Sequence, residues 1–369
     1  MRILVTGADG FIARNLRVRL RELGYGDVDC VTRASADAEL AAAVDRADFV
    51  FHLAGVNRPP DEQEFSRGNA GFTETLCAAL RRAGRKIPVA YSSSIQAERD
   101  NPYGRSKLGA ENVLREYAAA SGAHVWLFRL ANVFGKWSRP HYNSVVATFC
   151  HQIGRGQPIT VHDPRVPLNL VYIDDVVATF VALLTTPPPA GFAQVGPVYE
   201  STVGDVAEIL REFAASRTSL MTPRVGTGLV RALYSTYVSF LPKESFVYEV
   251  ARHSDPRGVF VEMLRTPDCG QFSYFTAHPG VVRGEHYHHS KTEKFLVICG
   301  TARFGFRNID SGETHELETR GGEGRIVETI PGWTHNIVNV GDDELVVMLW
   351  ANEVFDRARP DTVGMKVNP

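Results

Sequence analysis

A tyrosine, a lysine and a serine run form the first group of residues whose spacing suggests chemistry. Tyr103 precedes Lys107 by four residues, and three consecutive serines upstream end at Ser94. Positions four apart share one face of a helix, so we expect the lysine ammonium to lower the pKa of the phenol. Such a tyrosine can exchange a proton with a carbonyl or hydroxyl oxygen while a serine hydroxyl holds that oxygen. This spacing alone is a weak signal, which the cofactor-binding pattern upstream strengthens.

A glycine-rich turn between a short apolar strand and a helical pattern predicts a dinucleotide site near the start of the chain. Gly7 permits the tight turn, and Gly10 lets the backbone approach a pyrophosphate. Ala13 is small enough for the helix to pack closely on the strand. The amides at the start of the helix, at Phe11 and Ile12, would face the anion. The alternative is a tight turn without a ligand, but the flanking strand and helix favour the nucleotide site.

The ends of the next two predicted strands suggest which cofactor binds. The strand at residues 27–32 is followed by Arg33, where an acidic residue would bind a ribose 2′-hydroxyl. Arg33 can pair with a 2′-phosphate, so NADPH is favoured over NADH; the alternative is a solvated loop charge. The strand at residues 48–53 ends at Leu53, and the small residues Ala54 and Gly55 that follow would let the cofactor lie across the strand end.

The order of predicted elements divides the chain into two kinds of structure. Strands and helices alternate as far as about residue 216, which predicts an α/β Rossmann fold, a doubly wound parallel sheet with helices on both faces. We expect Asn69 to open a helix that runs through Leu80, and Thr202 to cap a helix at residues 203–213. A further helix is expected at residues 229–240. Beyond residues 240–246, short apolar runs separated by Gly, Pro and Asp predict an antiparallel all-β domain. We therefore predict an NADP-binding domain at residues 1–243 and an all-β domain at residues 244–369.

Histidines and a glutamate in the β-rich half predict a metal site. His286 and His288 are two apart, so they point to one side of a strand. Glu293 returns from the next strand, and His335 can arrive from a later one. Imidazoles and a carboxylate on rigid strands suit Zn²⁺ or a neighbouring divalent metal, with an open coordination position. His289 is expected to face away or to support the ligands. The alternative is a histidine-lined domain without metal.

The composition limits the compartment and the partners. The 369 residues carry a formal net charge of -2, so no strong field favours nucleic acid or a membrane surface. The five cysteines are scattered without a C-x-x-C pair, which indicates a reducing compartment and no disulfide framework. No uncharged apolar run reaches about 18 residues, so neither a secretory signal nor a membrane span is expected. We expect a cytoplasmic protein.

Several motifs together resemble the extended short-chain dehydrogenase/reductases that modify nucleotide sugars. They are Thr6-Gly-x-x-Gly-Phe-Ile-Ala13, His52-Leu-Ala-Gly55, Ser92-Ser-Ser94, Tyr103-x-x-x-Lys107, Arg129-Leu-Ala-Asn-Val-Phe-Gly135 and Val171-Tyr-Ile-Asp-Asp-Val176. The likeness covers about residues 1–215. It implies that Tyr103 is the acid/base, that Lys107 holds the nicotinamide ribose and that Ser94 orients the substrate oxygen. Spacing alone does not choose between Ser94 and Ser93.

The same resemblance implies where a UDP-sugar substrate would bind. In such enzymes, the segment corresponding to residues 132–170 holds the sugar nucleotide. Its candidate substrate contacts are Asn132, Lys136, Arg139, His141 and Arg165. For each of these residues taken alone, a solvated surface position is the alternative.

The metal-site spacing resembles that of the cupins. Gly280, His286, His288, Glu293 and Gly300 match the first cupin motif in their separations. The second motif is looser: His335-x-x-x-Asn339 fits, but Pro331-Gly332 is one residue short of the usual spacing. Residues 280–287 also resemble the sugar 3,5-epimerases, in which the histidine is a base rather than a ligand.

A reductase followed by a cupin resembles the bifunctional capsular polysaccharide enzymes of the CapF (WbjC) type. The likeness implies that the cupin half epimerises C3 of UDP-2-acetamido-2,6-dideoxy-4-hexulose. The reductase half would then reduce C4 with NADPH to UDP-2-acetamido-2,6-dideoxy-L-talose, on the route to UDP-N-acetyl-L-fucosamine for capsule or O-antigen. The base at C3 stays open among Glu285, His289 and Lys291.

Two other functions remain as alternatives. One is a 4-ketoreductase with a purely structural cupin, and the other is a non-enzymatic NADP-sensing binding protein. The complete serine, tyrosine and lysine set argues against the second. A homodimer is expected by analogy with both folds.

Overall fold

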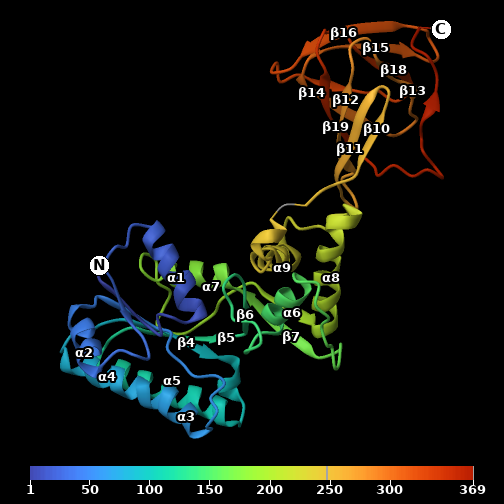
Figure 1. The fold of residues 1–369 in the computed structure, drawn as a ribbon. Coiled ribbons are helices and arrows are strands. Elements are labelled where there is room, and N and C mark those ends of the chain that lie inside the picture. The colour runs from blue at the N-terminus through green and yellow to red at the C-terminus, as the bar shows by residue number, and fades with distance from the viewer. Residues whose placement is uncertain (247, 369) are drawn as a thin grey trace. The chain divides into compact units, whose positions relative to one another are not determined.

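The computed structural model describes residues 1–246 and 248–368 as two compact units (Figure 1). The first unit comprises Met1–Leu210 and Arg231–Pro242, and the second comprises Arg211–Val230 and the chain from Lys243 onward. Residues 211–230 thus group with the second unit by their contacts, whereas the sequence placed them in the first domain. The predicted division at residues 243 and 244 stays a prediction.

The first unit is built on a six-stranded parallel sheet with the strand order β2-β1-β3-β4-β5-β8. Its strands are β1 (Ile3–Thr6), β2 (Val28–Val31), β3 (Phe49–His52), β4 (Val89–Ser94), β5 (Val125–Leu130) and β8 (Gly191–Ala193). The central strands are apolar on both faces, as a sheet covered by helices requires. β2 lies on one side of β1 and β3 lies on the other, so the strand order reverses direction at β1. The gap between the carboxyl ends of β1 and β3 is therefore the switch point where α/β sheets bind ligands.

Helices cover both faces of this sheet, as Figure 1 shows. On one face lie α1 (Phe11–Glu22) and α7 (Ile173–Ala182). On the other face lie α2 (Asp37–Arg46), α4 (Phe72–Arg82) and α5 (Pro102–Ser121), whose apolar sides join a buried cluster with the strands. The predicted Rossmann-type parallel sheet is confirmed.

The helical segment before α4 begins earlier than the sequence suggested. We expected Asn69 to open this helix, but α3 (Gln63–Ser66) and a π-helical turn (Arg67–Gly71) precede α4 without a break. Asn69 is buried inside the turn, where its side-chain amide donates to Val56 O and Ser106 Oγ at 2.9 Å and accepts from Val56 N. The prediction was wrong because the side chain of this asparagine hydrogen-bonds to the loop after β3 and does not cap a helix.

A small three-stranded sheet follows, with the strand order β6-β7-β9. It contains β6 (Asn132–Phe134), β7 (Pro167–Tyr172) and β9 (Val198–Thr202), and α6 (Val145–Ile153) lies between the first two in sequence. Helix α8 (Val203–Ser219) begins with the predicted cap: Asp205 N donates to Thr202 Oγ1 at 3.1 Å, and Thr202 N donates to Asp205 Oδ2 at 3.2 Å. Helix α9 (Gly228–Ser239) matches the expected helix at residues 229–240.

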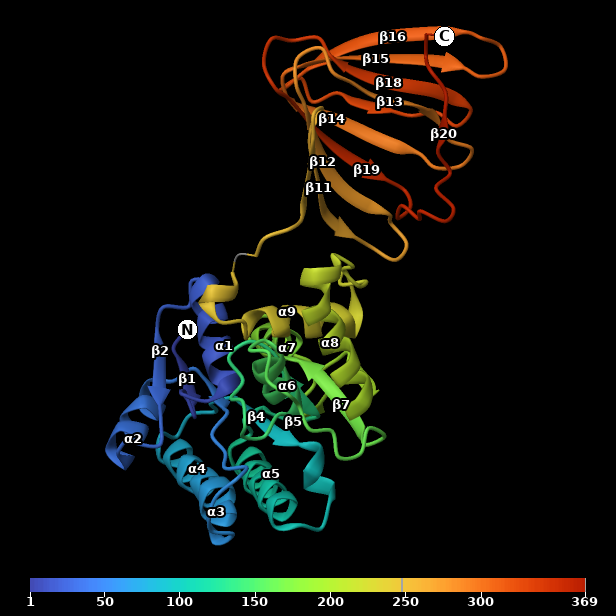
Figure 2. The same cartoon turned by 45° about the vertical axis from the view of Figure 1, so that its right-hand side comes forward.

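The second unit contains two antiparallel sheets whose inner faces share one apolar core (Figure 2). One sheet has the order β10-β11-β12-β19-β14-β17 and the other β16-β15-β18-β13-β20. The strands of the first are β10 (Arg252–Asp255), β11 (Gly258–Arg265), β12 (Gln271–Ala277), β14 (Glu293–Cys299), β17 (Ile326–Glu328) and β19 (Leu345–Ala351). Those of the second are β13 (Val282–Tyr287), β15 (Thr301–Asn308), β16 (Thr314–Arg320), β18 (Trp333–Asn339) and β20 (Val363–Gly364). The antiparallel all-β prediction is confirmed.

Among residues 1–246 and 248–368, the structure has no helix that is both long and apolar enough to cross a bilayer.

Candidate functional site

The start of α5 brings Tyr103 to the carboxyl end of β4. Pro102 opens the helix, and the Asn101 side chain caps it by accepting a hydrogen bond from Gly104 N at 2.8 Å. Gly104 lets this turn sit against the loop after β4, since a Cβ there would lie 2.2 Å from Gln96 O. Tyr103 is thereby hydrogen-bonded to Ser94, the last residue of β4.

The pKa of Tyr103 differs from the sequence-based expectation. Burial raises the pKa of this phenol above its ordinary value, and the hydrogen bond with Ser94 opposes that rise. The prediction that Lys107 lowers the pKa is wrong for this structure, because Lys107 Nζ instead donates to Ser92 O at 2.7 Å. Tyr103 is therefore protonated at neutral pH.

Lys107 lies in a buried pocket beside the strand ends. It is 4% exposed, and its Nζ lies 4.5 Å from the ring centroid of Tyr91. Burial lowers the pKa of Lys107 to about 7, although the Glu111 carboxylate opposes this effect. A Cβ at Gly55 would lie 3.5 Å from Nζ, so the lysine reaches the loop that follows β3. This is the edge of the sheet where a dinucleotide is expected.

The two candidate serines make different contacts. Ser93 Oγ donates to Glu111 Oε1 at 2.5 Å, and Arg129 pairs with the same carboxylate at 2.7 and 3.0 Å. Glu111 is fully buried, so Ser93 belongs to an internal network. Ser94 contacts the Tyr103 side chain and accepts from Gln96 N at 3.1 Å. The geometry favours Ser94 over Ser93 beside the tyrosine.

The predicted cofactor turn lies at the switch point between β1 and β3. Gly7 has φ 65°, and a Cβ there would lie 2.6 Å from Ala54 Cα, so only glycine allows this approach. Gly10 is the N-cap of α1 and supplies no side chain to satisfy the amides of the first turn, at Phe11 and Ile12. Leu53 and Ala54 directly follow β3. The arrangement can receive a pyrophosphate on backbone amides.

Arg33 lies on the loop after β2. Its side chain is 85% exposed and pairs with Glu64. An exposed arginine can redirect its guanidinium at little cost, so this position is compatible with a 2′-phosphate contact.

The predicted substrate residues have different neighbours. Asn132 begins β6, Lys136 pairs with Asp174, and the Arg139 guanidinium lies 5.0 Å from the ring centroid of Tyr142. The His141 ring lies 5.4 Å from the His151 ring, and Arg165 pairs with Asp163 at 3.2 Å.

A cavity of about 240 Å³ lies at the carboxyl end of β5, beside β7 and β9. Its lining residues are Ile95, Arg129, Leu130, Ala131, Asn169, Val171, Ala193, Val195, Val198 and Glu200. None of the five predicted substrate residues, all of which the structure describes, is among them. Sequence reasoning overlooked Arg129, Asn169 and Glu200, although Arg129 opens one of the family-like motifs.

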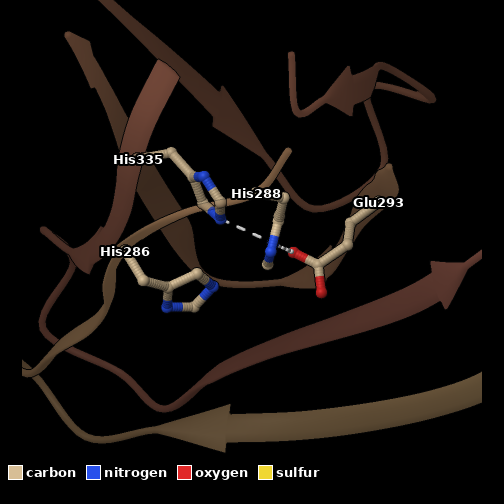
Figure 3. A group of neighbouring side chains, drawn as sticks. All are labelled: His286, His288, Glu293 and His335. Atoms are coloured by element: carbon tan, nitrogen blue, oxygen red, sulfur yellow. Dashed lines mark hydrogen bonds and ion pairs between the residues drawn. The ribbon is translucent and has the colours of Figure 1, made fainter. Parts of the chain in front are cut away.

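Three histidines and a glutamate converge between the two sheets of the second unit (Figure 3). His286 and His335 are register partners on β13 and β18, Glu293 begins β14 of the other sheet, and His288 follows β13. One potential ligand atom from each residue lies within 4.8 Å of the others. His288 Nε2 is 3.2 Å from Glu293 Oε2, and His335 Nε2 is 3.5 Å from the same oxygen. The predicted convergence is confirmed.

The protonation of this cluster suits a metal. Burial, with the nearby His335, lowers the pKa of His286 to about 4, so its imidazole is neutral at pH 7. Burial alone would raise the pKa of Glu293, but His288 and His335 outweigh it and hold the pKa well below its usual range. His335 Nε2 is buried without a hydrogen-bond partner among the described residues. A neutral His286 imidazole, an ionised Glu293 carboxylate and two further imidazoles, with ligand atoms that all lie within 4.8 Å of one another, fit a divalent metal.

The three candidate C3 bases lie in different environments. The Glu285 carboxylate accepts hydrogen bonds from an asparagine side chain and a backbone amide, at 2.8 and 2.7 Å. His289 is exposed. Lys291 is buried, and its Nζ lies 4.0 Å from Glu293 Oε1. Of the three candidates, Lys291 is therefore the one whose side chain pairs with a residue of the cluster, Glu293.

Comparisons with known proteins agree with both halves of this architecture. Residues 3–194, more than half of the chain, match the NAD dependent epimerase/dehydratase family, and residues 253–363 match the polysaccharide biosynthesis C-terminal domain. A relative from Pseudomonas aeruginosa, named UDP-2-acetamido-2,6-beta-L-arabino-hexul-4-ose reductase, is 58% identical over 368 residues, which span 100% of this chain and 99% of the relative.

Solved structures are similar over the same length. The capsular polysaccharide assembling protein CapF from Staphylococcus aureus superposes with a TM-score of 0.93 at 41% identity, covering 99% of this chain and 100% of that one. A structure of CapF with the inhibitor 3-isopropenyl-tropolone gives a TM-score of 0.88 at 36% identity, with the same coverage. The chain described here therefore belongs to the NAD dependent epimerase/dehydratase family and carries a polysaccharide biosynthesis C-terminal domain.

Proposed function

We propose that this protein is an NADPH-dependent reductase of a UDP-4-hexulose in the synthesis of a surface polysaccharide. The observation that carries the proposal is the hydrogen-bonded Ser94–Tyr103 pair at the end of β4, with Lys107 buried close by. The 58% identical relative, which is named as such a reductase, supports the substrate class.

The residues have complementary tasks in this reaction. When bound, the nicotinamide cofactor would supply the hydride that reduces C4. Tyr103 gives its Oη proton to the C4 oxygen, and the raised pKa of this phenol means that it carries that proton at neutral pH. Ser94 holds the same oxygen by a hydrogen bond, and Lys107 binds hydroxyls of the nicotinamide ribose. Gly7, Gly10, Leu53 and Ala54 shape the dinucleotide site, and Arg33 is the contact for a 2′-phosphate.

The substitution Tyr103→Phe tests this assignment. We expect NADPH oxidation with the 4-hexulose to fall by at least about 10²-fold, because the proton donor is lost, while NADPH binding persists. Tyr117→Phe is the control, since Tyr117 lies on the same helix but donates to Ile87 O at 2.9 Å. Wild-type turnover in Tyr103→Phe would show that another group supplies the proton.

We further propose that the second unit is a cupin that epimerises the same sugar at C3. The convergence of His286, His288, Glu293 and His335 between two antiparallel sheets supports this activity. A divalent metal held by these residues, most simply Zn²⁺, would act as a Lewis acid on the 4-ketone and make the C3 proton more acidic. Lys291 is the candidate to exchange that proton. The combined product would be UDP-2-acetamido-2,6-dideoxy-L-talose.

Proton NMR of the UDP-4-hexulose in heavy water, without NADPH, tests this second activity. We expect deuterium to appear at C3 with the wild-type protein and to vanish after chelation or with His288→Ala, which should still bind NADPH. Absence of exchange in the metal-loaded wild type, with NADPH still consumed, would leave a single-activity reductase with a structural β domain.

Three expectations from the sequence remain part of the proposal. They are a cytoplasmic location, a homodimer and a role for Asn132, Lys136, Arg139, His141 or Arg165 in holding the UDP moiety. Arg129, Asn169 and Glu200, which line the cavity at the end of β5, are added to the candidate substrate contacts.

A further inference from the structure

The chain near its carboxyl end contacts the loop that carries His288. The Asp361 carboxylate accepts hydrogen bonds from three successive backbone amides, those of His289 at 2.9 Å, Ser290 at 2.8 Å and Lys291 at 2.8 Å. It also accepts from Ser290 Oγ at 2.9 Å. Four donors on one carboxylate hold this loop in a single shape.

The backbone of Asp361 makes a second, separate contact with the cluster. Its carbonyl oxygen accepts a hydrogen bond from His288 Nδ1 at 2.6 Å, which leaves His288 Nε2, 3.2 Å from Glu293 Oε2, as the ring nitrogen that faces the cluster. Asp361 has φ 37°, an uncommon conformation for a residue with a side chain. The carboxylate and the carbonyl of one residue thus fix both the loop and the ring of His288.

The residues after Asp361 pair with β13, the strand that carries His286. Val363 and Gly364, which form β20, pair with Tyr287 and His286 on β13. Met365 N then donates to Glu285 O at 2.9 Å. Two further contacts secure the end of the segment: Val367 N donates to the Glu285 carboxylate at 2.7 Å, and Arg307 Nε donates to Val367 O at 2.8 Å. We name residues 361–367 the C-terminal strap.

We propose that Asp361 is a positioning residue for the metal centre, and that docking of the C-terminal strap and binding of the metal stabilise each other. The inference rests on the proposed metal centre. Groups that orient a metal-binding histidine through its second nitrogen raise the affinity of the site. Thermodynamic linkage is reciprocal: if docking of the strap raises the affinity for metal, then bound metal stabilises the docked strap by the same free energy.

Two substitutions at Asp361 separate positioning from folding. Asp361→Ala removes all four side-chain contacts, whereas Asp361→Asn keeps the size and one acceptor oxygen. Competition with a chromogenic chelator on the full-length protein should show Zn²⁺ affinity lowered by about 10- to 100-fold in the alanine variant and by less in the asparagine variant. Asp356→Ala is the matched control, because the contacts of Asp356 are with Ala358 N and Arg359 in its own segment.

A spectroscopic measurement distinguishes positioning from a general loss of stability. The visible spectrum of the Co²⁺-loaded protein reports ligand geometry, and we expect the bands to shift in Asp361→Asn but not in Asp356→Ala. NADPH binding, which belongs to the other unit, should be unchanged in all three variants and shows that the first unit is folded. A far-UV circular dichroism spectrum that matches the wild type shows that the second unit is folded. Unchanged affinity and an unchanged Co²⁺ spectrum in both Asp361 variants would overturn the inference.

Hydrogen exchange tests the reciprocal effect in the wild-type protein. Zn²⁺ should slow exchange of the amides of residues 289–291, which donate to Asp361, and also of residues 363–365 in the strap. Slower exchange at the histidine loop with no change in the strap would contradict the coupling. A wild-type protein that binds no Zn²⁺ would refute the proposed metal centre together with this inference, whereas normal binding in Asp361→Ala refutes the inference alone.

Discussion

The amine of Lys107 is buried, and burial destabilises its charged form. Its Nζ is buried and donates to a single backbone carbonyl, that of Ser92, and burial lowers its pKa to about 7. Glu111 opposes this effect without cancelling it. A change in pH around neutrality therefore alters the charge at the edge of the proposed cofactor site.

The pH dependence of stability should reveal this buried amine. Unfolded lysine keeps its proton up to about pH 10.5, whereas folded Lys107 loses it near pH 7, so the unfolded state binds more protons between these values. The unfolding free energy of the wild type should then rise from pH 7 to pH 10, relative to Lys107→Met, by up to roughly 4 kcal/mol. Urea unfolding at both pH values measures this difference. The exposed Lys86 provides the control Lys86→Met, and a difference that shrinks with pH would contradict the assignment.

At the same scale, spacing identified the tyrosine and the lysine but not their environment. The helical turn places Tyr103 beside Ser94 as expected, because the pattern is local to α5 and β4. The direction of the pKa shift was missed because it depends on burial by residues far along the chain, among them Phe65, whose ring lies 5.6 Å from that of Tyr103. Burial of this kind is not encoded in a four-residue spacing.

Among the elements, the first turn of α5 is the one on which the tyrosine depends most directly. Gly104 packs against the loop after β4, where a Cβ would lie 2.2 Å from Gln96 O and 2.3 Å from Arg99 O. Both contacts are with backbone atoms, which cannot rotate away. The turn and the loop are therefore closely fitted.

Adding one methyl group at this contact should displace Tyr103. We expect Gly104→Ala to lower the reduction rate by at least about tenfold and the unfolding free energy by roughly 1–3 kcal/mol, because the helix start must move away from β4. Gly109→Ala on the same helix is the control, since its Cβ would meet only the Ala70 methyl at 3.2 Å. Steady-state kinetics and thermal unfolding measure the two effects, and a fully active Gly104→Ala would show that the turn tolerates movement.

The elements also show which parts of the fold a sequence can predict. Apolar runs such as residues 271–277 and 293–299 match β12 and β14, because a buried strand needs an uninterrupted pattern. β10 and β16 were not predicted, since residues such as Arg252 and Glu316 are exposed and leave no apolar signal. The cavity residues were missed for another reason, because they are distant in sequence: Asn169 and Glu200 are paired across β7 and β9, and Arg129 comes to them from β5 of the other sheet.

On the scale of the whole molecule, each candidate site is built within one unit. Tyr103, Lys107 and Ser94 belong to the first unit, and the four metal-site residues belong to the second. Each set is complete without residues from the other. Loss of one activity should therefore leave the other intact.

Mixing two inactive variants tests this independence. Tyr103→Phe should retain C3 exchange, and His288→Ala should retain reduction of a sugar that is already epimerised. If the intermediate is released, the mixed proteins should make the final product at a rate that rises with concentration, as NMR of the product would show. Failure of the mixture, with each partial activity intact, would indicate that the sugar passes between sites without release.

The bond between His288 and Asp361 spans 73 positions, and this separation has a consequence for synthesis on the ribosome. Domains tend to fold from the N-terminus as the chain emerges, so the dinucleotide unit can acquire its sheet while the rest is still being translated. The histidine loop is made well before the residue that orients it. A nascent chain should thus hold metal weakly until Asp361 has been added and has reached the histidine loop.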